Sequence, residues 1–161
     1  MQKIDQDKIV ILDFGSQYTQ LIARRIREIG VLSEIVSCEI APKELLNLNP
    51  KGIIFSGGPE SVNSKFKPRF NSKILEINQP ILGICYGMQL LAKQCKGKVD
   101  LSAKREFGHS ELVFNKNILF KGVTEKKKKI NVWMSHGDKV VRLPKQFKKI
   151  ASSTNSKIAA F

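Results

Sequence analysis

The sequence predicts an α/β fold, with a mostly parallel sheet that has helices on both faces. Over residues 1–95, short apolar runs alternate with amphipathic segments. The runs contain few polar positions, which is typical of parallel strands that are buried on both sides. After about residue 99 the helical pattern stops. We therefore expect a smaller antiparallel or mixed β portion to follow the parallel sheet.

The first β-α-β unit is expected within residues 8–38. Lys8–Leu12 (KIVIL) is short and rich in β-branched residues, so it is interpreted as a buried strand. The segment 17–29 has isoleucines at i, i+4 and i+7 and ends before Gly30, which predicts a helix. A second strand is expected at 33–38.

The next elements have clear boundaries. Pro42 opens a short helical segment, 43–48, and a third strand is expected at 52–56. Glycines and prolines make 57–70 a loop, and a helix is expected at 69–77.

The remaining elements complete the alternation and then depart from it. A fourth strand, 80–84, precedes a helix, 87–95, whose apolar residues share one face. The later apolar runs are shorter and are separated by turns. These runs predict strands at 111–114, 130–135, 149–152 and 157–161.

One segment combines a strand-to-helix turn with a nucleophile. Gly83, Cys85 and Gly87 have the spacing Gly-x-Cys-x-Gly at the end of the fourth strand, which is similar to a nucleophile elbow. The small flanking residues leave room for a sharp turn, and the helix N-terminus favours a thiolate and then an oxyanion. Most cysteines are buried structural residues, and Cys38 and Cys95 fit that description. We therefore expect Cys85 to be a nucleophile.

A glycine-rich segment, Ser56–Ser61 (SGGPES), follows the third strand. The carboxyl ends of parallel strands meet at one edge of a sheet, where ligands bind. Glycines there allow backbone N–H groups to approach a ligand. By itself the segment is an ordinary glycine turn, but beside a cysteine elbow it offers a second donor for acyl chemistry.

A thiol nucleophile usually needs a base, and the chain has two histidines. His136 is expected at the end of a strand, where Asp138 could orient it. His109 is expected in a turn after Phe107 and Gly108. The local sequence leaves the choice between them open, since a lone histidine is more often structural.

Five segments together resemble the N-terminal amidotransferase domain of the GMP synthetase family, in the family's order. The Gly-x-Cys-x-Gly-x-Gln pattern alone marks the wider class I (triad) glutamine amidotransferases, whose fold is flavodoxin-like. The first and last segments narrow the resemblance to GMP synthetases. The segments are Asp13–Arg25 (DFGSQYTQLIARR), Ser56–Ser61, Gly83–Gln89 (GICYGMQ), Arg105–Gly108 (REFG) and Trp133–Asp138 (WMSHGD).

The resemblance implies a role for each matching residue. Cys85 would attack the side-chain amide of glutamine, releasing ammonia and forming a thioester that water hydrolyses. The backbone N–H groups of Gly58 and Tyr86 would form the oxyanion hole. The glutamine would be held by Gln89 and by the segment Ser135, His136, Gly137 and Asp138, which makes His136 a binding residue rather than the base.

The resemblance also implies parts that these 161 residues lack. The family's base and orienter lie in a His-Pro-Glu segment, which does not occur here. Residues 1–161 are thus expected to be one amidotransferase domain, incomplete at its C-terminus and inactive alone. No cofactor is expected in this domain. ATP and magnesium would belong to an ATP pyrophosphatase domain, the expected partner, in a homodimeric full-length protein that converts xanthosine monophosphate to GMP.

Composition limits the other functional classes. The net charge is +14, but 22 of the 28 basic residues are lysines, scattered apart from one run at Lys126–Lys129. This pattern favours a solvated surface over a nucleic-acid site, which tends to use arginine and aromatic residues on one face. The three cysteines have no disulfide or metal spacing, and the polar start, Met1–Lys8, is no secretory signal. A cytoplasmic protein without a membrane span is expected.

Three alternatives remain. The nearest is an amidotransferase that serves another synthase as a separate subunit, such as that of anthranilate synthase. The second is a catalytically dead binding module with the same fold. The third is a basic nucleic-acid binder, whose mark would be steeply salt-dependent DNA binding.

Overall fold

The computed structural model describes residues 7–123 and 129–161, with the backbone alone for 102–106. The start of the N-terminal segment and Lys126–Lys128 of the lysine run lie outside the described residues. The chain divides into two compact units, Met1–Leu90 and Leu91–Phe161. Each unit is described by itself.

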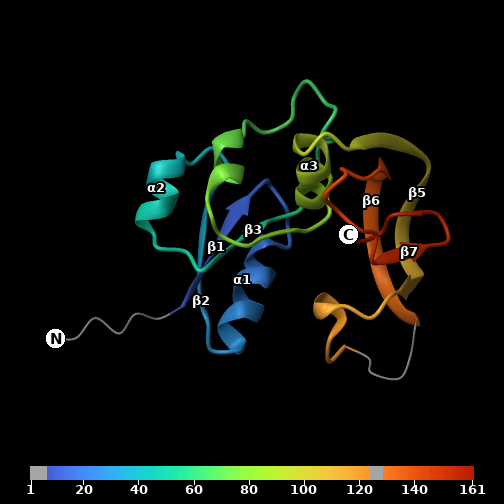
Figure 1. Ribbon diagram of the computed structural model, residues 1–161, viewed down its shortest axis with the longest axis horizontal. Helices are drawn as coiled ribbons and strands as arrows, with labels where there is room; N and C mark the ends of the chain where they lie inside the picture. Colours follow the sequence, from blue (N-terminus) through green and yellow to red (C-terminus); the bar gives the residue numbers. More distant parts are fainter. Residues whose placement is uncertain (1–6, 124–128) are drawn as a thin grey trace. The chain divides into compact units, whose positions relative to one another are not determined.

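The first unit is built on a four-stranded sheet (Figure 1). The strand order is β2-β1-β3-β4, and every neighbouring pair is parallel. The predicted parallel sheet is therefore confirmed. Its strands are β1 (Lys8–Asp13), β2 (Leu32–Ser37), β3 (Gly52–Phe55) and β4 (Ile81–Gly83).

The central strand β1 is covered on both faces. Val10, Ile11 and Leu12 are each fully buried, although successive side chains of a strand point to opposite faces. The prediction that this apolar run is a strand buried on both faces is therefore confirmed.

Three helices accompany the parallel strands. They are α1 (Thr19–Glu28), which contacts β1 and β2, α2 (Pro42–Asn47) and α3 (Tyr86–Gln94). All three lie within one or two residues of the predicted helices. In α1 the apolar face is anchored by Ala23, which is fully buried.

The helix predicted at 69–77 is wrong. The structure has only a short 3₁₀ helix there, η1 (Ser72–Glu76), whose first residue is preceded by Asn71. The Asn71 side chain accepts a hydrogen bond from the Lys73 amide at 3.1 Å. Only Ile74 of this helix is buried, so the segment has too few apolar contacts to stabilise a longer helix.

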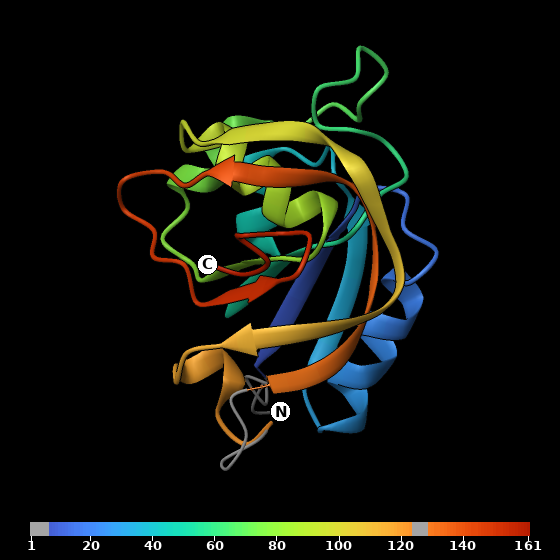
Figure 2. The same cartoon turned by 90° about the vertical axis from the view of Figure 1, so that its right-hand side faces the viewer.

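The second unit contains an antiparallel sheet with the order β6-β5-β7. Figure 2 shows β5 and β6 as a long, curved ribbon. The predicted antiparallel portion is confirmed, although its strands are longer than expected. They are β5 (Lys98–Phe114), β6 (Lys129–Arg142) and β7 (Ala151–Ser153), with a 3₁₀ helix, η2 (Ile118–Phe120), between the first two.

Two predicted strand boundaries need correction. The strand predicted at 111–114 is only the end of β5, because few residues before it are apolar and the alternation is weak. The strand predicted at 157–161 is reduced to an isolated bridge between Ala151 and Ala160. Leu112, Phe114 and Ala151 form a small hydrophobic cluster in this unit. Burial alternates around Leu112, which explains why the sequence predicted a strand there.

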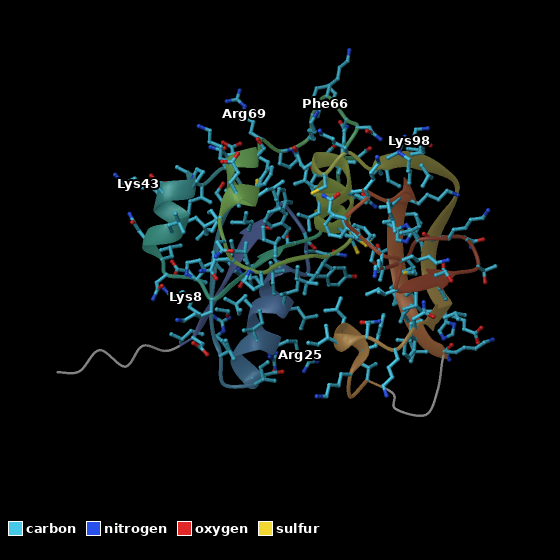
Figure 3. The ribbon with its side chains drawn as sticks, viewed as in Figure 1. Lys8, Arg25, Lys43, Phe66, Arg69 and Lys98 are labelled. Carbon is cyan, nitrogen blue, oxygen red and sulfur yellow. The ribbon has the colours of Figure 1, made fainter. Side chains whose placement is uncertain are left out.

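Charged side chains extend outward from several elements. In Figure 3 the labelled Lys43 and Arg69 project away from the ribbon. Lys8 and Lys98, which the figure also labels, lie in β1 and β5, whereas Lys43 lies in α2, so these lysines are not gathered on one element. In the described part of the chain, no helix is both long and apolar enough to cross a membrane.

Candidate active site

Cys85 lies in the turn that joins β4 to α3. Strand β4 ends at Gly83 and α3 begins at Tyr86, so only two residues make the turn. Cys85 has φ of 49°, in the left-handed region that a residue with a side chain rarely adopts. Such strain is common at functional sites, and it places this cysteine in an elbow as its spacing predicts.

The two flanking glycines are required by close backbone contacts. A Cβ on Gly83 would lie 2.5 Å from the Met88 nitrogen, and a Cβ on Gly87 would lie 2.6 Å from the Phe55 Cβ. The start of α3 therefore packs directly against the end of β3. The predicted need for small residues on both sides of Cys85 is confirmed.

The glycine turn after β3 meets the elbow. A Cβ on Gly57 would lie 3.7 Å from the Cys85 Cβ and 3.3 Å from the Ser16 Oγ. The Gly87 amide donates to the Ser56 carbonyl at 3.1 Å. The glycine turn and the cysteine elbow thus share one edge of the sheet.

Two backbone amides at this edge, those of Gly58 and Tyr86, make no hydrogen bond within the described residues. Gly58 also has no room for a side chain, since its Cβ would lie 2.6 Å from the Phe14 carbonyl oxygen. An oxyanion hole needs free donors of this kind.

The loop after β1 lies beside the glycine turn. The Asp13 Oδ1 accepts from the Gly15 amide at 2.9 Å and from the Thr19 hydroxyl at 2.8 Å. Its carboxylate therefore holds the loop in place just before α1. Ser16 lies beside Gly57, a proximity that no spacing or periodicity in the sequence indicates. It belongs to the Asp-Phe-Gly-Ser-Gln-Tyr segment that carries the family resemblance.

Four aromatic rings lie together in the first unit and link the loops of the site. Phe14 follows β1, Phe55 ends β3, and Tyr86 begins α3. The ring centroids of Phe14 and Tyr86 are 5.3 Å apart, and those of Phe55 and Phe70 are 5.2 Å apart. Tilted and edge-to-face pairs at such distances are favourable. The cluster therefore fixes the ends of β1, β3 and β4 relative to one another.

Burial favours the neutral form of the Cys85 thiol. The residue is exposed at its surface, but desolvation raises the pKa of the thiol above its ordinary value of 9.0. No charged side chain among the described residues offsets this effect. The expected contribution of the helix N-terminus opposes this desolvation, and a base would assist removal of the proton.

The Tyr86 side chain has an anchoring position rather than a reactive one. Its hydroxyl is buried and has no hydrogen-bond partner in the described structure. Desolvation, assisted by Cys38 and Glu60, raises the pKa of Tyr86 to about 12. The phenol therefore stays neutral.

Gln89 lies one helical turn after Cys85. Its amide donates to the Cys85 carbonyl at 3.0 Å, and its side chain is buried. The structure thus brings Cys85, Gly58, Tyr86 and Gln89 together in the first unit.

The other predicted binding residues lie in the second unit. Ser135, His136, Gly137 and Asp138 are consecutive in β6; Ser135 is exposed and Asp138 is buried. The prediction that His136 ends a strand is wrong, because β6 continues to Arg142. A register shift beside the Glu106–His136 pair marks an irregularity there.

The turn predicted for His109 is also wrong. His109 lies within β5 and pairs with Trp133 of β6. Gly108, which suggested a turn, has φ of 106° but remains in the ladder opposite Met134. The glycine thus bends the strand without ending it.

The described residues do not suggest a metal site. Among the described residues, no group of three or more His, Cys, Asp or Glu side chains could hold an ion. The three cysteines, Cys38, Cys85 and Cys95, are free thiols.

Several known proteins with similar sequences are GMP synthases. GMP synthase [glutamine-hydrolyzing] from Coxiella burnetii is 49% identical over 166 residues, which cover 99% of this chain and 32% of that protein. The enzyme of that name from Marinobacter nauticus is 50% identical over 165 residues, or 99% of this chain and 31% of that protein. The chain therefore spans about a third of the length of these curated relatives.

Solved structures agree on the fold. A protein described as a GMP synthase subunit, from Thermoplasma acidophilum, has a TM-score of 0.82 and 30% identity, over 95% of this chain and 76% of that chain. A glutamine amidotransferase from Thermotoga maritima has a TM-score of 0.73 and 20% identity, over 94% and 69% of the two chains. The second comparison supports the fold alone.

The family assignment follows from the match along the sequence. The pattern of the family described as glutamine amidotransferase class-I matches residues 10–161. This range contains the cysteine elbow, the glycine turn and strand β6. The chain belongs to the class-I glutamine amidotransferase family.

Proposed function

We propose that the chain is the glutamine-hydrolysing part of a GMP synthase. The observation that carries this proposal is the strained Cys85 elbow, which faces a glycine turn with a free amide. This arrangement suits acyl transfer from an amide to sulfur. The curated relatives, which share about half of their residues with this chain over the matched segment, supply the substrate class.

In the proposed reaction, the sulfur of Cys85 adds to the side-chain carbonyl carbon of glutamine. The carbonyl oxygen takes the negative charge, which the amides of Gly58 and Tyr86 stabilise. The base that took the Cys85 thiol proton during the attack passes it to the amide nitrogen, which leaves as ammonia, and a thioester remains on Cys85. Water hydrolyses the thioester to glutamate and restores the thiol. Gln89 and the segment 135–138 hold the substrate.

The base is proposed to come from a His-Pro-Glu segment of the kind found in the family, rather than from His136 or His109. The raised pKa of Cys85 makes such a base necessary. The 161-residue chain assayed alone should therefore release glutamate from glutamine about 10²–10⁴-fold more slowly than a protein that contains this segment. Comparable rates would assign the base to one of the two histidines.

The released ammonia is proposed to serve the ATP-dependent amination of xanthosine monophosphate to GMP. That step would require an ATP pyrophosphatase part, with ATP and magnesium, in a homodimer. The glutaminase part itself is proposed to need no cofactor. A cytoplasmic location is proposed because a reducing compartment would keep the exposed Cys85 as a thiol.

The test uses a chimera in which this chain replaces the matching segment of the Coxiella burnetii enzyme. The intact chimera should form GMP with either glutamine or free ammonia. Its Cys85→Ala variant should use ammonia alone, because ammonia bypasses the thioester. Loss of both activities in a folded variant would contradict the role of Cys85. An intact chimera that uses only ammonia would favour the catalytically dead binding module.

A further inference from the structure

A serine at the end of β3 makes two hydrogen bonds that the proposed mechanism has not yet used. Ser56 is fully buried. Its hydroxyl accepts from the Phe14 amide at 3.0 Å and donates to the Gly57 carbonyl at 2.9 Å. A buried hydroxyl that both accepts and donates is fixed in orientation.

The second of these bonds controls the direction of a different group. The Gly57 carbonyl and the Gly58 N–H belong to one planar peptide unit, and this unit is trans. In a trans peptide the C=O and N–H point in opposite directions. By holding the Gly57 oxygen toward its own side chain, Ser56 therefore turns the Gly58 N–H to the opposite side.

Close packing around Gly58 limits this peptide, but no other hydrogen bond of the described residues sets its direction. Glycine rotates freely compared with other residues, and two glycines in succession give the peptide between them the greatest freedom. The Gly58 amide makes no hydrogen bond within the described residues that could hold it. The Ser56 hydroxyl is thus the polar contact that restrains this unit.

Ser56 also joins the peptide to the two other parts of the site. Through the Phe14 amide it is connected to the loop after β1. Through its own carbonyl it accepts from the amide of Gly87, two residues after Cys85. The donor and the nucleophile are therefore held by the same residue.

We propose that Ser56 is a positioning residue that orients the Gly58 amide toward the oxyanion formed during attack by Cys85. This inference rests on the proposed glutaminase function, of which it names one further part. Ser56 does not touch the substrate, and it acts through the peptide that it holds.

The experiment compares two reactions of the same thiol in the 161-residue chain. With p-nitrophenyl acetate, the sulfur adds to the ester carbonyl, the oxygen becomes negative, and p-nitrophenolate then leaves an acetyl thioester on Cys85. The thiol proton passes to the buffer. With iodoacetamide, the sulfur displaces iodide and no oxyanion forms. The Cys85→Ala variant supplies the background from Cys38 and Cys95.

Ser56→Ala should slow acylation about 10-fold or more, since complete loss of one oxyanion donor costs about 10²–10³ in rate. Alkylation by iodoacetamide should remain unchanged. Ser64→Ala is a matched control, because it removes a serine hydroxyl from the same loop region that bonds to the Phe66 amide instead. It should leave both rates unchanged.

Equal slowing of both reactions, or no slowing of either, would overturn the proposal. So would wild-type acylation that is no faster, relative to alkylation, than that of a free thiol. Ser56→Thr keeps the hydroxyl and should keep the wild-type ratio, which covers the case in which Ser56→Ala fails to fold. Loss of the ratio in folded Ser56→Thr would also count against the inference. None of these readouts requires glutamine turnover, so a failure of the glutaminase proposal is recognised separately by the chimera.

Discussion

Replacement of Gly87 by alanine should destabilise the first unit and disturb the nucleophile together. A Cβ at this position would lie 2.6 Å from the Phe55 Cβ and 2.7 Å from the Phe55 carbonyl carbon. The carbonyl carbon belongs to the backbone of β3, so no side-chain rotation can relieve that contact. The start of α3 must move away from the sheet instead.

The size of the effect can be worked from the contacts that would be lost. Overpacking of this kind costs about 1–3 kcal/mol. Movement of α3 also weakens the hydrogen bond from the Gly87 amide to the Ser56 carbonyl, 3.1 Å long, which contributes about 0.5–1.5 kcal/mol. We therefore expect Gly87→Ala to lower the free energy of unfolding by about 1.5–4.5 kcal/mol.

The assay is urea denaturation followed by circular dichroism, with alkylation of Cys85 measured on the folded protein. Gly52→Ala is the matched control, because a Cβ there would meet mainly the flexible end of the Ile9 side chain, at 3.1 Å. It should cost less than Gly87→Ala. A Gly87→Ala protein as stable as wild type, with unchanged alkylation, would refute the argument that this contact forces the elbow.

Four further expectations follow from the same structure. Gly58→Pro removes an amide donor and should reduce glutaminase activity of the chimera about 10²–10³-fold; unchanged steady-state kinetics would exclude the donor role. Cys85→Gly should be about 1 kcal/mol more stable than Cys85→Ala in urea denaturation, because φ of 49° suits glycine; equal stability would argue against strain. Desolvation raises the pKa of the Cys38 and Cys85 thiols above 9.0, so their contribution to stability is complete below pH 9.0 and is lost as pH rises through the folded pKa values. Urea denaturation on both sides of that pH should show a smaller loss for the Cys38→Ala/Cys85→Ala double variant, and an equal loss would contradict the linkage. Duplex DNA should bind no more tightly than about 10⁻⁴–10⁻⁶ M at physiological salt in a fluorescence-anisotropy titration, and submicromolar, sequence-dependent binding would revive the nucleic-acid alternative.

The parallel half of the fold was predictable because its signals are local. Lys8–Leu12 is apolar at successive positions, and only burial on both faces explains that pattern. The extent of the antiparallel strands β5 and β6 was harder to predict from the sequence. In β5 only one side of the strand is buried near Leu112, and the first part of the strand contains few apolar residues. Gly108 also suggested a turn, although it lies within the β5–β6 ladder.

Part of the site could likewise be predicted from neighbouring residues in the sequence, whereas another part depends on contacts between residues far apart in the chain. The spacing around Cys85 describes a turn of a few residues, so it could be interpreted without any partner. The bond between the Ser56 hydroxyl and the Phe14 amide joins residues 42 positions apart. No periodicity reports such a contact. Similarly, the pKa of Cys85 is raised by desolvation in the folded unit. The extent of that burial could not be predicted from the local sequence around Cys85.

The strain at Cys85 needs a rigid surrounding, and the first unit provides one. A side chain in the left-handed region costs about 1–3 kcal/mol, and an isolated strand-to-helix turn would relax. Here the aromatic pair of Phe14 and Tyr86 adds about 0.5–1.5 kcal/mol beyond its buried area. The pair of Phe55 and Phe70 adds a similar amount. These rings belong to the same loops that carry the glycine turn and the elbow, so relaxing Cys85 would require separating them. The nucleophile is thus held in its exposed conformation by contacts that involve neither its sulfur nor the substrate.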